Sequence, residues 1–152
     1  LVEQINWKYA TPSWKPVIFV RRHFSLTELL ALYRISDAGI VGSLHDGMNL
    51  VAKEYVASCT NGRGMLVLSQ FTGAAKELTD AVLINPYDSL QFGEGIFAAL
   101  QLSPEERLRR MEKMREVVRV NNIYRWAGKV ISDLLKFEFK EASTHHAHGL
   151  FV

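Results

Sequence analysis

Three short apolar runs divide the middle of this 152-residue chain. Each run is followed by a loop rich in glycine or polar residues and then by a stretch with helical periodicity. Continuous apolar runs of this length are typical of strands that are covered on both faces, as in parallel sheets. The alternation therefore predicts an α/β fold, a Rossmann-like parallel sheet flanked by helices. The expected strands are Ala38–Val41, Met65–Leu68 and Ala81–Ile84, and the expected helices are Leu50–Ser58, Ala74–Leu78 and Ser89–Leu100.

The segment before these strands predicts two more elements. Val17–Val20 is rich in β-branched and aromatic residues, and we expect a further buried strand there. Ser25 and Glu28 have the spacing of a capping box, in which each side chain accepts a hydrogen bond from the other residue's backbone amide. They predict a helix that ends near Ser36, with an apolar face formed by Leu26, Leu29, Leu30 and Tyr33.

The C-terminal part predicts two helices and a tail. Ser103 followed by Pro104 is a strong helix start. Asn121-Asn122 should end that helix, and a final amphipathic helix should follow as far as Phe137. We therefore expect one domain at residues 1–140 and a disordered tail at residues 141–152. The core stripe of the first helix would be Leu108, Met111, Met114 and Val118.

Composition excludes several classes of protein. No apolar run approaches the ~20 residues that span a bilayer, so we expect neither a membrane segment nor a secretory leader. The net charge of +2, from 18 basic and 16 acidic residues, is too balanced for nucleic-acid binding. Cys59 is the only cysteine, which fits a reducing cytoplasm and predicts a small buried residue. The histidines in His145–His148 lack partners at ligand spacing, and we expect no metal.

One segment, Ser43–Glu54, has a composition suited to ligand binding. It joins an expected strand to an expected helix, and open α/β sheets bind ligands at this end of their strands. The following helix offers unpaired amides and a positive dipole end to a diphosphate. Asp46 and Glu54 are carboxylates of the kind that accept hydrogen bonds from sugar hydroxyls. The residues alone also allow a simpler interpretation, in which Asp46-Gly47 only turns the chain.

A second segment, Ser69–Ala75, has the same order of strand, polar loop and helix. One interpretation is a tight connection in which Thr72 caps the helix. The other is that this loop and the Asp46 loop line one rim of a pocket, because they follow neighbouring strands.

Beyond these patterns, the residues Asp46–Val56 closely resemble the signature of the trehalose-6-phosphate synthase family of retaining glycosyltransferases. The resemblance extends from about Val2 to Phe137. It implies the C-terminal half of a two-domain GT-B enzyme, which binds UDP-glucose without a cofactor or catalytic metal. The acceptor, glucose-6-phosphate, would bind to an N-terminal domain. Further matching segments, in the same order, are Val2–Asn6, Leu32–Asp37, Leu66–Phe71 and Val82–Asp88.

The resemblance also implies a role for each matching residue. Asp46 would act at the catalytic centre by hydrogen-bonding a glucose hydroxyl, and Glu54 would hold the ribose. Phe24 and Leu29 would border the uracil, although a hydrophobic staple and a core position remain open as their structural alternatives. The backbone groups of Gly47, Met48 and Asn49 would contact the sugar, and those of Leu50 and Val51 the diphosphate.

Two departures from the family's pattern leave alternatives open. His45 stands where the family usually has arginine, and so lacks a fixed charge and a forked donor. The family's arginine–lysine pair that clamps the diphosphate would precede this sequence, and we expect the isolated chain to be inactive. The alternatives are a non-catalytic interaction module with the same fold, and a related retaining glycosyltransferase with another nucleotide sugar. A homo-oligomer also remains open.

Overall fold

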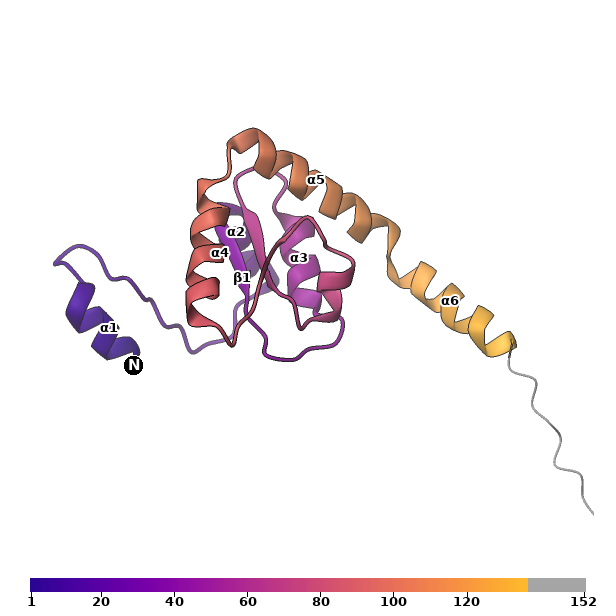
Figure 1. Ribbon diagram of the computed structural model, residues 1–152, viewed down its shortest axis with the longest axis horizontal. Helices are drawn as coiled ribbons and strands as arrows, with labels where there is room; N and C mark the ends of the chain where they lie inside the picture. Colours follow the sequence, from indigo (N-terminus) through magenta and orange to yellow (C-terminus); the bar gives the residue numbers. More distant parts are fainter. Residues whose placement is uncertain (137–152) are drawn as a thin grey trace, which may run out of the picture.

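The computed structural model describes residues 1–136. Its centre is a parallel three-stranded sheet in the order β1-β2-β3, with helices on both faces (Figure 1). Val41 of β1 lies beside Leu68 of β2, and Ser69 of β2 lies beside Ile84 of β3. This arrangement confirms the predicted α/β class. The strands are β1 (Ala38–Val41), β2 (Met65–Ser69) and β3 (Val82–Ile84).

The helices form a layer on each side of the sheet. On one face, α3 (Leu50–Ser58) packs against β1 and β2, with α2 (Leu26–Ile35) and α5 (Pro104–Val120) beside it. On the other face, α4 (Ser89–Gln101) contacts all three strands (Figure 1). A short 3-10 helix, η1 (Gly73–Lys76), lies between β2 and β3 where the sequence predicts Ala74–Leu78.

The core lies between the sheet and these helices. Every residue of β2 is buried, as expected for the middle strand of a parallel sheet. Tyr55 of α3 is also buried, and its ring occupies the space where a side chain at Gly39 of β1 would lie. Burial raises the pKa of the Tyr55 phenol, whose oxygen lies 3.2 Å from Ser36 Oγ. Cys59 is buried, as predicted, and donates its thiol hydrogen to the Tyr33 carbonyl at 3.1 Å.

The predicted helix starts are confirmed. Ser25 and Glu28 form the capping box of α2, with both reciprocal bonds present. Ser103 Oγ accepts from the Glu106 amide at 3.2 Å at the start of α5. In the predicted stripe of α5, Met111 and Met114 are buried, but Leu108 is exposed.

The predicted strand at Val17–Val20 is wrong. Ile18 and Phe19 are 81% and 67% exposed, and the segment forms no ladder with the described strands. Instead, the backbone amide of Val17 donates to Asn6 Oδ1 at 3.0 Å, and its carbonyl accepts from Asn6 Nδ2 at 2.9 Å. A strand needs a neighbour for its backbone groups, and the described sheet ends at β1. Asn6 belongs to α1 (Val2–Tyr9), which lies apart from the sheet (Figure 1).

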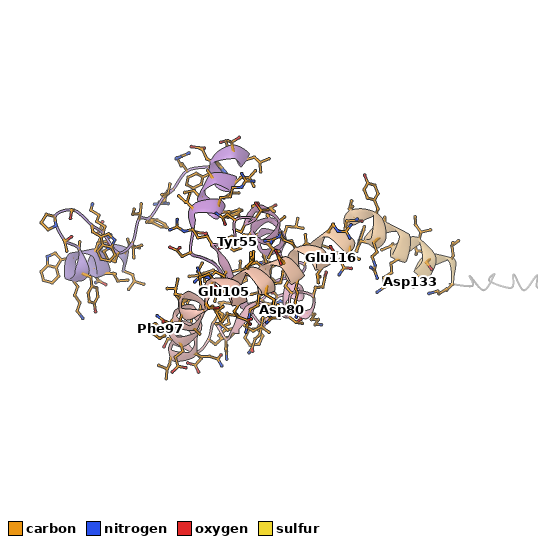
Figure 2. All side chains as sticks on the ribbon, turned by 90° about the horizontal axis from the view of Figure 1, so that it is seen from above. Tyr55, Asp80, Phe97, Glu105, Glu116 and Asp133 are labelled. Carbon is orange, nitrogen blue, oxygen red and sulfur yellow. The ribbon has the colours of Figure 1, made fainter. Side chains whose placement is uncertain are left out.

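The last described helix, α6 (Ile123–Leu135), extends away from the body of the molecule (Figures 1 and 2). Its N-cap Asn122 accepts from the amides of Tyr124 and Arg125, which explains the predicted break. No helix within residues 1–136 has the length and apolar character to cross a membrane. Phe137 and the predicted tail at 141–152 lie outside the described residues.

Candidate functional site

The candidate site lies where the three strands end. Because the strands are parallel, the loops that follow them emerge at one edge of the sheet. The first loop contains Asp46 and leads into α3, the second contains Phe71 and leads into η1, and the third contains Tyr87 and leads into α4.

Backbone hydrogen bonds join the first two loops. The Asp46 amide donates to the Phe71 carbonyl at 3.3 Å, and the Gly73 amide donates to the Gly47 carbonyl at 2.6 Å. A side chain at Gly73 would overlap the carbonyl oxygen of Gly47, so this close approach requires glycine. The two loops therefore lie side by side at the edge of the sheet, as expected for loops that follow neighbouring strands. Thr72 precedes η1, but its hydroxyl donates to the Ser69 carbonyl at 3.0 Å and does not cap the helix.

The third loop adds a residue that the sequence analysis missed. The Tyr87 hydroxyl donates to the Leu44 carbonyl at 3.4 Å, and its ring meets that of Phe71 edge to face with centroids 5.4 Å apart. Tyr87 thus connects all three loops. The signal available in the sequence was its position three residues after a predicted strand. Loops that follow parallel strands all emerge at the same edge of the sheet, where ligands bind.

Asn49 is the structural centre of the first loop. Its backbone is left-handed, with φ of 54°, and its side chain is 8% exposed. Its Oδ1 caps α3 by accepting from the Ala52 amide at 2.9 Å, and its Nδ2 donates to Asp46 Oδ2 at 2.6 Å. Asparagine suits this position because it tolerates positive φ and provides both an acceptor and a donor. Asn49 therefore couples the helix start to the position of Asp46.

Asp46 is half-buried, and this coupling holds its carboxylate in place. Oδ2 also lies 3.4 Å from Ser43 Oγ, which donates to it. Within residues 1–136, Oδ1 accepts no hydrogen bond. The carboxylate is therefore held through Oδ2, and Oδ1 is left able to accept a hydrogen bond.

The first turn of α3 lies beside this carboxylate in sequence. The amides of Leu50 and Val51 donate no hydrogen bond within residues 1–136, as is usual for the first amides of a helix. Leu50 and Val51 are at least half exposed, and Met48 is partly exposed. Unpaired amides at the positive end of a helix dipole suit a phosphate group.

The other predicted site residues lie on helix surfaces. Glu54 is exposed one turn further along α3, and it adds to the effect of burial in raising the pKa of Tyr33 on α2. Phe24 and Leu29, at the start of α2, are half-buried. The guanidinium of Arg22 lies 4.4 Å from the centre of the Phe24 ring. No hydrogen bond in the described part joins Phe24 or Leu29 to the Asp46 loop.

The described residues contain no group of three or more histidine, cysteine, aspartate or glutamate side chains that is arranged to hold a metal ion. Lys53 of α3 pairs with both carboxylate oxygens of Glu77 at 3.1 Å.

A parallel sheet with a carboxylate and a free helix start at its loop edge belongs to the open α/β domains, which bind their ligands at this edge. The chain belongs to glycosyltransferase family 20, which it matches over residues 1–136. Curated trehalose-6-phosphate synthases are its relatives. Those of Cronobacter sakazakii and Escherichia coli are each 46% identical over 132 residues. These alignments cover 86% of this chain but 28% of each relative, so the chain spans less than a third of their length.

Solved structures agree with this assignment. The Escherichia coli enzyme bound with UDP-2-fluoro glucose matches at a TM-score of 0.84 and 42% identity, over 90% of this chain and 31% of that one. The synthase of Burkholderia xenovorans in complex with glucose-6-phosphate matches at 0.83 and 38%, over 88% and 30%. These neighbours support the GT-B type of α/β fold for the described residues.

Proposed function

We propose that this chain is the donor-binding domain of a trehalose-6-phosphate synthase. In the complete protein it holds UDP-glucose while glucose is transferred, with retention, to glucose-6-phosphate. The observation that carries this proposal is the arrangement at the start of α3: an oriented Asp46 carboxylate next to two unpaired amides. The match to an enzyme bound with a UDP-glucose analogue supports the same ligand class.

The contacts proposed for Asp46 and for the first amides of α3 use groups that form no other hydrogen bond within residues 1–136. Oδ1 of Asp46 accepts a hydrogen bond from a glucose hydroxyl, and the Leu50 and Val51 amides donate to the diphosphate. Backbone groups of Gly47, Met48 and Asn49 line the sugar. Asn49 keeps its side chain for positioning, since both its amide nitrogen and its oxygen are already bonded.

The nucleoside contacts complete the proposed site. Glu54 is exposed one turn from the diphosphate amides, where its carboxylate can bind both ribose hydroxyls. Phe24 and Leu29 border the uracil from the start of α2, the helix that packs beside α3. Residues 1–140 would form this donor-binding unit, and we propose a cytoplasmic location.

The acceptor site is assigned to the rest of the protein. The chain spans about 28% of its curated relatives, so a second domain would supply the glucose-6-phosphate pocket and close the cleft. Positioning of donor against acceptor contributes roughly 7–11 kcal/mol to such reactions. We therefore propose that the chain alone binds donor but does not turn it over.

Calorimetric titration with UDP tests the proposal. We expect binding at about 0.1–1 mM, or about −4 to −5.5 kcal/mol, because only part of the cleft is present. Glu54→Ala removes a charged acceptor and should weaken binding by about tenfold or more, corresponding to about 1.5 kcal/mol or more. Asp46→Ala should weaken UDP binding less, because its partner is the glucose that UDP lacks.

Glu94→Ala is the matched control. It removes an exposed glutamate from α4, on the opposite face of the sheet, and should leave the affinity unchanged. A folded chain that binds no UDP at millimolar concentration would refute the donor-site proposal and favour the non-catalytic module. Equal affinity in all three variants would refute the assigned contacts.

A further inference from the structure

A pocket lies outside the proposed donor site, where α5 meets α6. It is lined by Lys53 and Glu77 from the body of the domain, by Asn121 at the end of α5, and by Arg125, Trp126 and Lys129 of α6. Met48 is the only residue that lines this pocket and also belongs to the proposed donor contacts. The two sites are therefore adjacent, but they depend on different side chains.

The charges in this pocket do not balance. Lys53 forms an ion pair with Glu77, and both carboxylate oxygens lie 3.1 Å from the lysine Nζ. Asn121 Nδ2 donates to the same carboxylate at 3.0 Å, so the hydrogen-bonding capacity of Glu77 is largely used. Three cationic side chains against one carboxylate leave the lining with a formal charge of +2.

That surplus lies on α6. Arg125 and Lys129 are four residues apart, which places them on the same side of the helix. Within residues 1–136, neither forms an ion pair with an acidic side chain. Like charges at this spacing repel one another and destabilise the helix, so a ligand that neutralises both relieves this repulsion.

We propose that this pocket binds a phosphate-bearing small molecule. Arg125 provides a forked donor that matches two phosphate oxygens, and Lys129 provides a second charge. The amides of Tyr124 and Arg125 are already capped by Asn122, so recognition depends on the side chains and not on the helix end. The half-exposed ring of Trp126 forms an apolar wall beside the cations. This site is separate from the donor site and does not rest on its assignment.

Trp126 also provides a local probe. The chain has three tryptophans, and the other two, Trp7 and Trp14, are 91% and 59% exposed and far from this pocket in sequence. A Trp7→Phe/Trp14→Phe background leaves Trp126 as the only indole. Its fluorescence can then be followed during titration with inorganic phosphate, with sodium chloride adjusted to hold ionic strength constant.

We expect a saturable fluorescence change, with affinity reduced at least tenfold by Arg125→Gln/Lys129→Gln. The control Lys136→Gln removes a cation at the end of the same helix, outside the pocket, and should change the affinity by less than twofold. Circular dichroism verifies that each variant is folded. Equal phosphate affinity with and without the double substitution would place binding elsewhere, for example at the start of α3, and would overturn the proposal. A change that does not saturate would also overturn it. UDP titration of the same variants should show unchanged affinity, which keeps this test independent of the donor site.

Discussion

Asn49 allows the sharpest test of how the loop that contains Asp46 is held together. Asn49→Ala removes three favourable features at once: the cap of α3, the bond to Asp46 and the tolerance of positive φ. The cap contributes about 1 kcal/mol to the free energy of unfolding. The left-handed backbone costs alanine about 1 kcal/mol. The bond to a carboxylate contributes about 1.5 kcal/mol. We therefore expect a loss of about 3–4 kcal/mol, a large part of the total for a domain.

Asn49→Gly separates these contributions. Glycine adopts positive φ without strain and is a fair N-cap, so it should lose mainly the bond to Asp46 and some chain entropy, or about 2 kcal/mol. Urea unfolding followed by circular dichroism measures both variants, and an unchanged m-value validates the comparison. An alanine variant at least as stable as the glycine variant would refute the argument that φ of 54° constrains this position.

Asn49→Asp examines the bond to Asp46 alone. Aspartate is an equally good cap, but it replaces the amide donor, 2.6 Å from Asp46 Oδ2, with a second carboxylate. We expect destabilisation at pH 7 that diminishes as the pH falls and one of the two carboxylates takes up a proton. The exchanged pair Asp46→Asn/Asn49→Asp should recover most of the lost stability. Failure of this rescue, with Asn49→Asp itself destabilised, would show that the contact is not the main role of Asn49.

Three further predictions concern other parts of the chain. Gly73→Ala should weaken UDP binding at least tenfold, because its side chain would overlap the Gly47 carbonyl, whereas Gly93→Ala, which has open space around it, should not. Arg22 and the Ser25 amide and hydroxyl lower the pKa of Glu28 from 4.5 to about 2; its capping contribution is therefore present above pH 4.5 and lost as the pH falls through 2. The protection of the first-turn amides of α2 against hydrogen exchange, relative to their intrinsic exchange rates, should fall over that range, but not in Glu28→Ala. Burial raises the pKa of the Cys59 thiol, so its reaction with a disulfide reagent should be slow in the native chain and follow urea unfolding.

Local sequence rules predicted most of the fold, because its elements carry their own signals. The bounds of β1 and α3 follow from an apolar run and from an amphipathic segment after Asn49. The starts of α2 and α5 follow from Ser25 and Ser103, whose side chains cap them regardless of distant contacts. Val17–Val20 shows where such rules fail. Its composition favours a strand, but a strand also requires a partner, and the described sheet has none at that position.

The sequence predicted which residues form the first loop of the candidate site, but not the tertiary contacts that this loop makes. Asp46, Asn49 and the amides of the α3 start lie in one continuous segment, so sequence alone placed them together. Tyr87 and Gly73 join that segment through tertiary contacts, a bond to Leu44 and a bond to Gly47. Neither pairing has a local signature, because each depends on the order of the strands in the sheet. The surplus positive charge of Arg125 and Lys129 also could not be predicted from the sequence, because it depends on the tertiary pairing of Lys53 with Glu77 in the same pocket.

The location of the hydrogen bonds that hold the proposed site explains why we expect this chain to bind donor without catalysing transfer. The proposed sugar and diphosphate contacts belong to a loop and helix start that are held by hydrogen bonds within the described residues, chiefly those of Asn49 and Gly73. Their geometry therefore does not require a second domain. Catalysis differs, because it requires an acceptor aligned against the donor in a closed cleft, and that alignment cannot be provided from one side. Residual UDP affinity together with absent turnover is thus the expected behaviour of the chain.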